Sequence, residues 1–174
     1  DDYAYYEALA YQDLANITSG QLLLDESIDY AQTGLINIEK WIALFPADYD
    51  RLALAKELLL ERLSICYLFS GDLESALNTQ NTAFKSAIKR HDKYMQLRID
   101  YERGGTRLHT NLKDGIQRLK NRYIESLECE TLFEEEPALI HAMLLVGKLL
   151  KENASRRKRK MEEIYNESMK LEYS

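Results

Sequence analysis

The residues that could carry chemistry in this 174-residue chain are few and scattered. Its three histidines, His91, His109 and His141, lie in no HExxH motif and at no ligand spacing from a cysteine, so they predict no zinc site. The acidic run Glu134–Glu136 places neighbouring carboxylates on an expected loop, where they do not converge on one cation without further ligands. No phosphate-binding glycine loop and no nucleophile elbow occurs. We therefore expect no catalytic residues, no cofactor and no bound metal.

The sharpest charge feature is a basic run near the end of the chain. It consists of Arg156, Arg157, Lys158, Arg159 and Lys160. Positive charge at a helix start opposes the macrodipole, so the run does not serve helix stability. Two interpretations stay open: a patch for an anionic partner, or a solvated turn between two helices. The net charge of −6 argues against nucleic acid as the main partner, because that surface would have to be basic.

The two cysteines bear on the compartment. Cys66 and Cys129 form neither a disulfide framework nor a metal-ligand pattern, and Cys66 lies in the apolar run SICYLF as an expected core residue. This pattern favours a reducing compartment, and we expect a cytoplasmic protein. No apolar run approaches the ~18 residues of a membrane span. Because the chain starts at Asp1 rather than Met, we expect a fragment of a longer protein.

Apolar residues recur three and four positions apart along almost the whole chain, which predicts an all-α fold. Breaks are expected at Ser19-Gly20, Phe45-Pro46 and Ser70-Gly71-Asp72, where glycine, proline and an N-capping aspartate occur. The expected helices cover residues 2–19, 22–45, 48–70, 72–90, 92–110, 112–130, 137–152 and 155–172.

These helices form hairpins that repeat along the chain. Three pairs of similar residues lie 42 positions apart: Tyr123 and Tyr165, Ser126 and Ser168, and Leu127 and Met169. A fixed period of this size is the signature of a helical array that works by presenting a continuous surface to another molecule.

The hairpins resemble the tetratricopeptide repeat, most clearly over residues 60–83. The matching positions there are Leu60, Leu63, Ser64, Tyr67, Gly71, Asp72, Ala76 and Ala83. The spacing is longer than the family's usual ~34 residues, so the chain is similar to a long-period variant. The resemblance implies a right-handed superhelical array of about four antiparallel hairpins, roughly residues 2–45, 48–90, 92–130 and 137–172, within a single domain.

Small residues are expected where helices approach closely. Ala76 should face the first helix of its own hairpin, and Gly147 should behave alike. The adjacent Gly104 and Gly105 indicate either a close contact or a break in their helix, because glycine inside a helix costs about 1 kcal/mol relative to alanine.

The resemblance also implies that the first helices of the hairpins line a concave face that binds a peptide segment or partner protein. The residues expected there are Gln12, Asn16, Glu61, Ile65, Glu102, Thr106, His109, Lys148 and Lys151. Glu61 and Glu102 are expected to be exposed, so reversing their charge should leave folding unchanged. The set lacks the paired cations with which some members clamp a C-terminal carboxylate, which disfavours a chaperone adaptor.

Two other roles stay open. One is a ligand- or peptide-sensing domain of a larger signalling or transcription-regulatory protein, and the other is a scaffold whose exposed repeat ends support oligomers. The tyrosines from Tyr3 to Tyr6 are expected to pack on a partner or on a preceding repeat.

Overall fold

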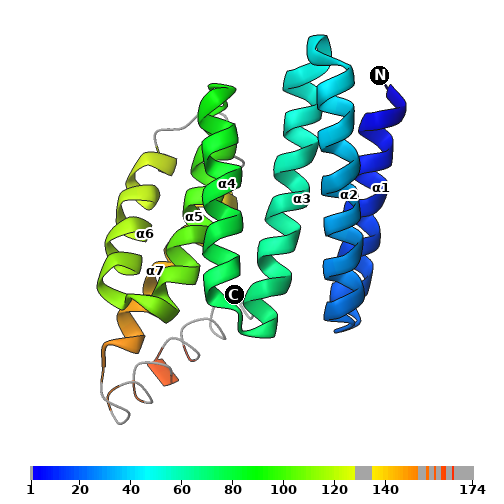
Figure 1. Cartoon of the computed structure of the whole chain (residues 1–174). Coiled ribbons are helices and arrows are strands. Elements are labelled where there is room, and N and C mark those ends of the chain that lie inside the picture. The colour runs from blue at the N-terminus through cyan, green and yellow to red at the C-terminus, as the bar shows by residue number, and fades with distance from the viewer. Residues whose placement is uncertain are drawn as a thin grey trace. The chain divides into compact units, whose positions relative to one another are not determined.

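A computed structural model of the chain describes residues 2–127 and 135–152, together with positions 156, 159, 162, 163 and 166. The elements are α1 (Asp2–Gly20), α2 (Leu24–Leu44), the 3₁₀ turn η1 (Pro46–Asp48), α3 (Tyr49–Ser70), α4 (Leu73–Lys89), α5 (Lys93–Thr110), α6 (Leu112–Leu127) and α7 (Glu135–Leu150) (Figure 1). The described residues contain no strand, so the all-α prediction is confirmed. Seven expected helices appear with nearly the predicted bounds. The eighth, over residues 155–172, lies outside the described residues except at the five single positions.

The breaks between helices mostly follow the predicted chemistry. Gly71 adopts the left-handed conformation (φ 85°) that ends α3, and the Asp72 side chain accepts a hydrogen bond from the Ser75 N–H at 3.0 Å to cap α4. The end of α1 differs, because Gly20 stays helical and Leu22 takes the left-handed conformation (φ 61°). The break considered at Gly104 is wrong, since α5 runs unbroken to Thr110.

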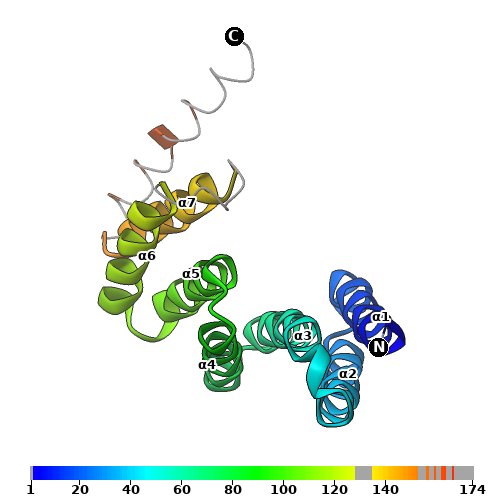
Figure 2. The same cartoon turned by 90° about the horizontal axis from the view of Figure 1, so that it is seen from above.

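The chain forms two compact units, Asp1–Thr106 and Arg107–Ser174, with the boundary inside α5. In the first unit, α1 packs on both α2 and α3, α2 packs on α3, and α3 packs on α4. Figure 1 shows α1, α2 and α3 running side by side, and Figure 2 shows them end-on as a triangle. Each of these three helices therefore contacts the other two.

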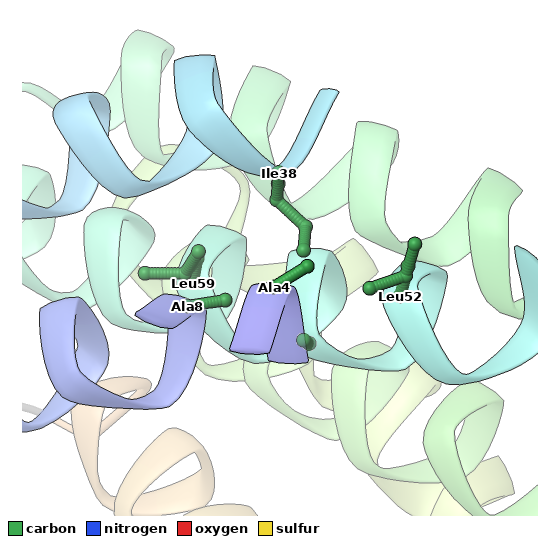
Figure 3. Packing of buried hydrophobic residues seen from close by; sticks show 6 residues of the cluster. Ala4, Ala8, Ile38, Leu52 and Leu59 are labelled. Atoms are coloured by element: carbon green, nitrogen blue, oxygen red, sulfur yellow. The ribbon is translucent and has the colours of Figure 1, made fainter. Parts of the chain in front are cut away.

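Small residues on α1 allow this triangle to close. Figure 3 shows Ala4 and Ala8 facing Ile38 of α2 and the leucines Leu52 and Leu59 of α3. The helices also approach closely at Gly34 of α2. An added Cβ there would lie 2.8 Å from Cβ of Tyr11 of α1 and 3.0 Å from Cδ2 of Leu59 of α3.

A second core cluster joins α3, α4 and the first part of α5. It is built from Leu60, Ala83, Ala87, Met95 and Ile99. The α4 residues Ala76, Ala83 and Ala87 are all fully buried, as predicted for Ala76. Alanine at these positions lets the neighbouring helices approach closely.

Cys66 is a core residue, as predicted. It is buried on α3, with its sulfur 2.9 Å from Oγ of Ser27. Because Ser27 donates its own hydroxyl proton to the Ala15 carbonyl at 2.6 Å, the Cys66 thiol is the donor in this pair. Cys129 lies outside the described residues.

In the second unit, α6 packs on α7. Gly147 of α7 is buried, and an added Cβ would lie 2.7 Å from Cδ2 of Leu108 and 2.9 Å from Cγ1 of Ile116. Gly147 is therefore a close-packing site, as predicted. Its neighbours differ from the prediction, because they belong to the end of α5 and to α6 and not to the α7 hairpin.

Candidate partner-binding site

The nine residues predicted for a concave face divide between the two units. The first unit holds Gln12, Asn16, Glu61, Ile65, Glu102 and Thr106, and the second holds His109, Lys148 and Lys151. Asn16 is exposed, and Gln12 and Ile65 are half-buried. The structure brings Glu61 and Glu102 together, but it buries Glu61 and Thr106.

The carboxyl groups of Glu61 of α3 and Glu102 of α5 lie within hydrogen-bonding reach of each other. Nε of Arg98, one turn before Glu102, donates to Oε1 of Glu61 at 2.7 Å, and Nη1 of Arg98 donates to the Tyr94 hydroxyl at 3.3 Å. Although burial disfavours the charge of Arg98, its pKa is raised because Glu61 stabilises the cation. We call Glu61, Glu102 and Arg98 the carboxyl pair cluster.

A hydrogen bond between these two carboxyl groups requires a proton on one of them, because two carboxylates cannot hydrogen-bond to each other. Burial raises the pKa of Glu102 well above its ordinary value, the negative charge and hydrogen bond of Glu61 raise it further, and Arg98 and Arg62 oppose the shift. Oε2 of Glu102 is inaccessible to solvent and has no hydrogen-bond partner among the described residues. Glu102 is therefore the member of the pair whose protonated form is favoured by its surroundings.

This geometry overturns the expectation that Glu61 is an exposed groove residue. Its charge is balanced by Arg98 inside the helix packing, so a change to lysine there would place two cations together. Thr106 is also unavailable to a partner, because its buried Oγ1 accepts a hydrogen bond from Nε2 of Gln80 at 2.9 Å. Both side chains hold α5 against its neighbours within the first unit.

A second buried ion cluster was missed by the sequence analysis. Glu57 of α3 is fully buried and accepts from Nε and Nη2 of Arg90, both at 3.0 Å, and from Oγ of Ser86 at 2.7 Å. Arg90 also donates to Asp92 at 2.6 Å. The signal was present, because Glu57 and Glu61 lie four positions apart within an apolar helix, on one face.

A shallow hollow on the first unit was also missed. It has a volume of about 200 Å³ and is lined by Glu7, Asn37, Lys40, Trp41 and Leu44. The Glu7 carboxylate accepts from Nε1 of Trp41 at 2.7 Å and from Nδ2 of Asn37 at 3.3 Å. These bonds fix the indole beside α1.

In the second unit, the three predicted residues His109, Lys148 and Lys151 are exposed. A hollow of about 310 Å³ lies beside Asn111, Lys113, Asp114 and Gln117 at the start of α6. The Asp114 carboxylate there is engaged by Arg107 at 3.2 Å and Arg118 at 3.1 Å.

The basic run is described at two of its five positions. Arg156 and Arg159 are exposed, and each lies near a glutamate four positions away, Glu152 at 3.2 Å and Glu163 at 4.0 Å. Such exposed pairs contribute little to stability. Arg157, Lys158 and Lys160 lie outside the described residues, so both interpretations of the run stay open.

Within the described ranges, no group of three or more His, Cys, Asp or Glu side chains is placed to hold a metal ion. No described helix combines the length and apolar character needed to cross a membrane. Comparison with known proteins found no matching family model, no matching curated protein and no matching solved structure.

Proposed function

We propose that this chain is an array of helical hairpins, similar to the tetratricopeptide repeat, that binds a segment of a partner protein and catalyses no reaction. The observation that supports this most directly is the packing of α1 on α3 as well as on α2. In stacked hairpins, each first helix meets the first helix of the next hairpin, and each repeat buries its apolar face against its neighbours. In its finer form the proposal is a right-handed superhelix of about four hairpins.

The proposed binding surface lies on the first helices of the hairpins. In the first unit it consists of the exposed Asn16 with the half-buried Gln12 and Ile65. The carboxyl pair cluster lies behind this surface and fixes α5 on α3 instead of contacting the partner. The second unit by itself exposes His109, Lys148 and Lys151. The positive charges of its two lysines favour an acidic stretch of a partner and affect association rate and specificity more than affinity.

A sensing role is the second candidate, and the shared proton of Glu61 and Glu102 favours it. Loss of that proton would leave two negative charges between α3 and α5, with Arg98 and Arg62 as the facing cations. Repulsion between the carboxylates would then loosen the packing that supports the proposed surface. Partner affinity that falls as pH rises, and does so less in Glu102→Gln, would support sensing. A partner affinity that does not change with pH would exclude the sensing role and favour binding alone.

Site-specific photo-crosslinking tests the binding face. A photoreactive amino acid is placed at Asn16 or Ile65 on the first helices, and at the exposed Thr33 or Asn78 on the second helices α2 and α4 as matched controls. We expect the first-helix positions to crosslink one common partner, identified by mass spectrometry, and the second-helix positions to miss it. Crosslinks to that partner only from Thr33 and Asn78 would contradict the proposed face.

A further inference from the structure

Helix α1 has two apolar faces, and several of its larger apolar side chains are exposed. Its buried face carries the small residues Ala4, Ala8 and Ala15, which pack on α2 and α3. The opposite face carries an apolar stripe with spacings of three, four, four and three positions, which places its members on one side of a helix. This exposed stripe consists of Tyr3, Tyr6, Ala10, Leu14 and Ile17.

The exposure of the stripe is large. The exposed fractions are 64% for Tyr3, 62% for Tyr6, 41% for Leu14 and 58% for Ile17. A surface helix normally turns its polar side outward, and a helix that is apolar on both sides is normally covered on both. Contiguous exposed apolar surface of this kind is typical of interaction sites. The stripe extends about 21 Å along α1, which suits a partner helix of about four turns.

Acidic residues border the stripe on both edges. Asp2 and Asp13 lie along one edge and Glu7 along the other, since helical positions repeat every 3.6 residues. The wider surroundings are acidic too: residues 1–44 contain eight acidic residues and one basic residue, Lys40. An apolar stripe with negative edges is complementary to an amphipathic helix whose apolar stripe has positive edges, as at coiled-coil seams.

The chain itself shows how this face holds a cation. The Arg51 guanidinium pairs with Asp2 and lies 4.4 Å from the ring centroid of Tyr5 and 5.9 Å from that of Tyr6. A guanidinium over aromatic rings beside a carboxylate gains from both charge and ring attraction. Of the two rings, Tyr6 belongs to the stripe, and the stripe continues beyond it with the aliphatic residues Ala10, Leu14 and Ile17.

Charge also discriminates against two other occupants. In a pair of copies joined stripe to stripe, the acidic edges would face each other, and like charges at such edges repel. A membrane surface with anionic lipids would repel this region as well, because interfacial helices need basic edges.

We propose that the exposed stripe of α1 docks a cationic amphipathic helix of a partner protein. The apolar side of that helix covers Tyr6, Leu14 and Ile17, and its lysines or arginines meet Asp13. Glu7, whose oxygens accept from Trp41 and Asn37, adds negative charge at the other edge. This surface lies opposite the alanine face of α1, with Tyr3 touching Trp41 of α2 and Tyr6 near Arg51 of α3 at its first turn. The inference goes beyond the binding face of the proposed function.

The test uses the full chain and designed 18-residue helical peptides carrying a fluorescent label. The first peptide has a Leu/Ile stripe with Lys/Arg edges, the second keeps the stripe but has Glu edges, and the third keeps Lys/Arg but replaces the stripe with Gln. We expect fluorescence anisotropy to show at least about tenfold tighter binding of the first peptide than of either other, because both apolar contact and charge are needed.

Variants then locate the site. Leu14→Ser with Ile17→Ser should weaken binding of the first peptide about tenfold or more, as loss of central apolar contacts does. Asp13→Lys should weaken it several-fold and flatten its salt dependence. Ile36→Ser is the matched control, since Ile36 is also 58% exposed but lies on α2, and it should stay within twofold.

Several results would overturn the proposal. These are equal binding of the Glu-edged peptide, an equal loss in Ile36→Ser, or no binding of the first peptide at about 100 μM. Analytical ultracentrifugation of the chain alone, and sedimentation with vesicles, test the two other occupants. A dimer abolished by the Leu14 and Ile17 changes would assign the stripe to a second copy. Sedimentation with phosphatidylserine vesicles that depends on the same two residues would assign it to a membrane.

Discussion

Removing one partner from the Glu57 cluster should destabilise the first unit far more than removing the whole ion pair. Glu57 is fully buried and is held by Arg90 through two hydrogen bonds of 3.0 Å and by Ser86 through one of 2.7 Å. Arg90→Met keeps an apolar side chain of similar length but leaves the carboxylate with Ser86 as its remaining donor among the described residues.

The magnitude follows from the uncompensated charge. Breaking a buried pair by removing one partner costs about 3–5 kcal/mol, whereas replacing both partners by apolar residues of similar volume is often neutral or stabilising. We therefore expect Arg90→Met to lose about 3–5 kcal/mol of unfolding free energy. The double variant Glu57→Leu with Arg90→Met should stay within about 1 kcal/mol of the parent or exceed it.

Urea unfolding followed by fluorescence of Trp41 reports on this unit, because the chain's one tryptophan lies on α2. With a urea dependence of about 2 kcal/mol per molar, the single variant should shift the midpoint by roughly 2 M. The control is Lys56→Met, which breaks the pair of Lys56 with the exposed Glu39 (2.8 Å) and should cost below about 1 kcal/mol. If Arg90→Met costs no more than Lys56→Met, the reasoning about the buried charge is wrong.

Three further outcomes are expected. Burial raises the pKa of Glu102 in the folded state, so protonation of this carboxyl group stabilises the fold. That stabilisation is complete below the ordinary pKa of 4.5 and is lost as pH rises through the folded-state pKa. In urea unfolding, the unfolding free energy relative to Glu102→Gln should therefore fall from pH 5 to pH 8, and a rise would contradict the assignment. Gly147→Ala should lower the unfolding free energy by roughly 1–3 kcal/mol, because its Cβ would lie 2.7 Å from Cδ2 of Leu108. Gly20→Ala is the control and should raise the unfolding free energy by about 0.5–1 kcal/mol, because an added Cβ there has nothing within 4 Å. Unfolding followed by circular dichroism measures both, and equal effects would refute the packing argument. Leu22→Gly should raise stability by up to about 1 kcal/mol by relieving the left-handed conformation at φ 61°, and a clear loss would contradict this.

Helix positions could be predicted from sequence because their signals are local. The period of the apolar residues defines each helix, and the caps at Gly71 and Asp72 act within three or four residues. The exception at Leu22 is also instructive. Gly20, two positions earlier, was the predicted left-handed residue, but it stays helical and Leu22 takes that conformation.

The burial of charged residues could not be predicted in the same way. Glu61 was expected on an exposed concave face and Glu57 was given no role, but α3 packs on α1, α2 and α4, and its side chains also meet α5. Their partners Arg90 and Arg98 come from other helices, 33 and 37 positions away. No spacing rule connects residues at such separations, so the pairing appears only when the helices are packed.

The inward face of α1 was decided by side-chain size and not by hydrophobicity. The sequence offers two apolar faces, and the larger residues Tyr6, Leu14 and Ile17 would bury more surface than alanine does. At Gly34 of α2, however, an added Cβ would lie only 2.8 Å from Cβ of Tyr11 of α1, so the two helices approach closely where α2 lacks a side chain. The alanine face fits this separation, and the larger face is left outward. Close packing within the unit therefore produces the exposed stripe, and the acidic residues beside it define which partner it can accept.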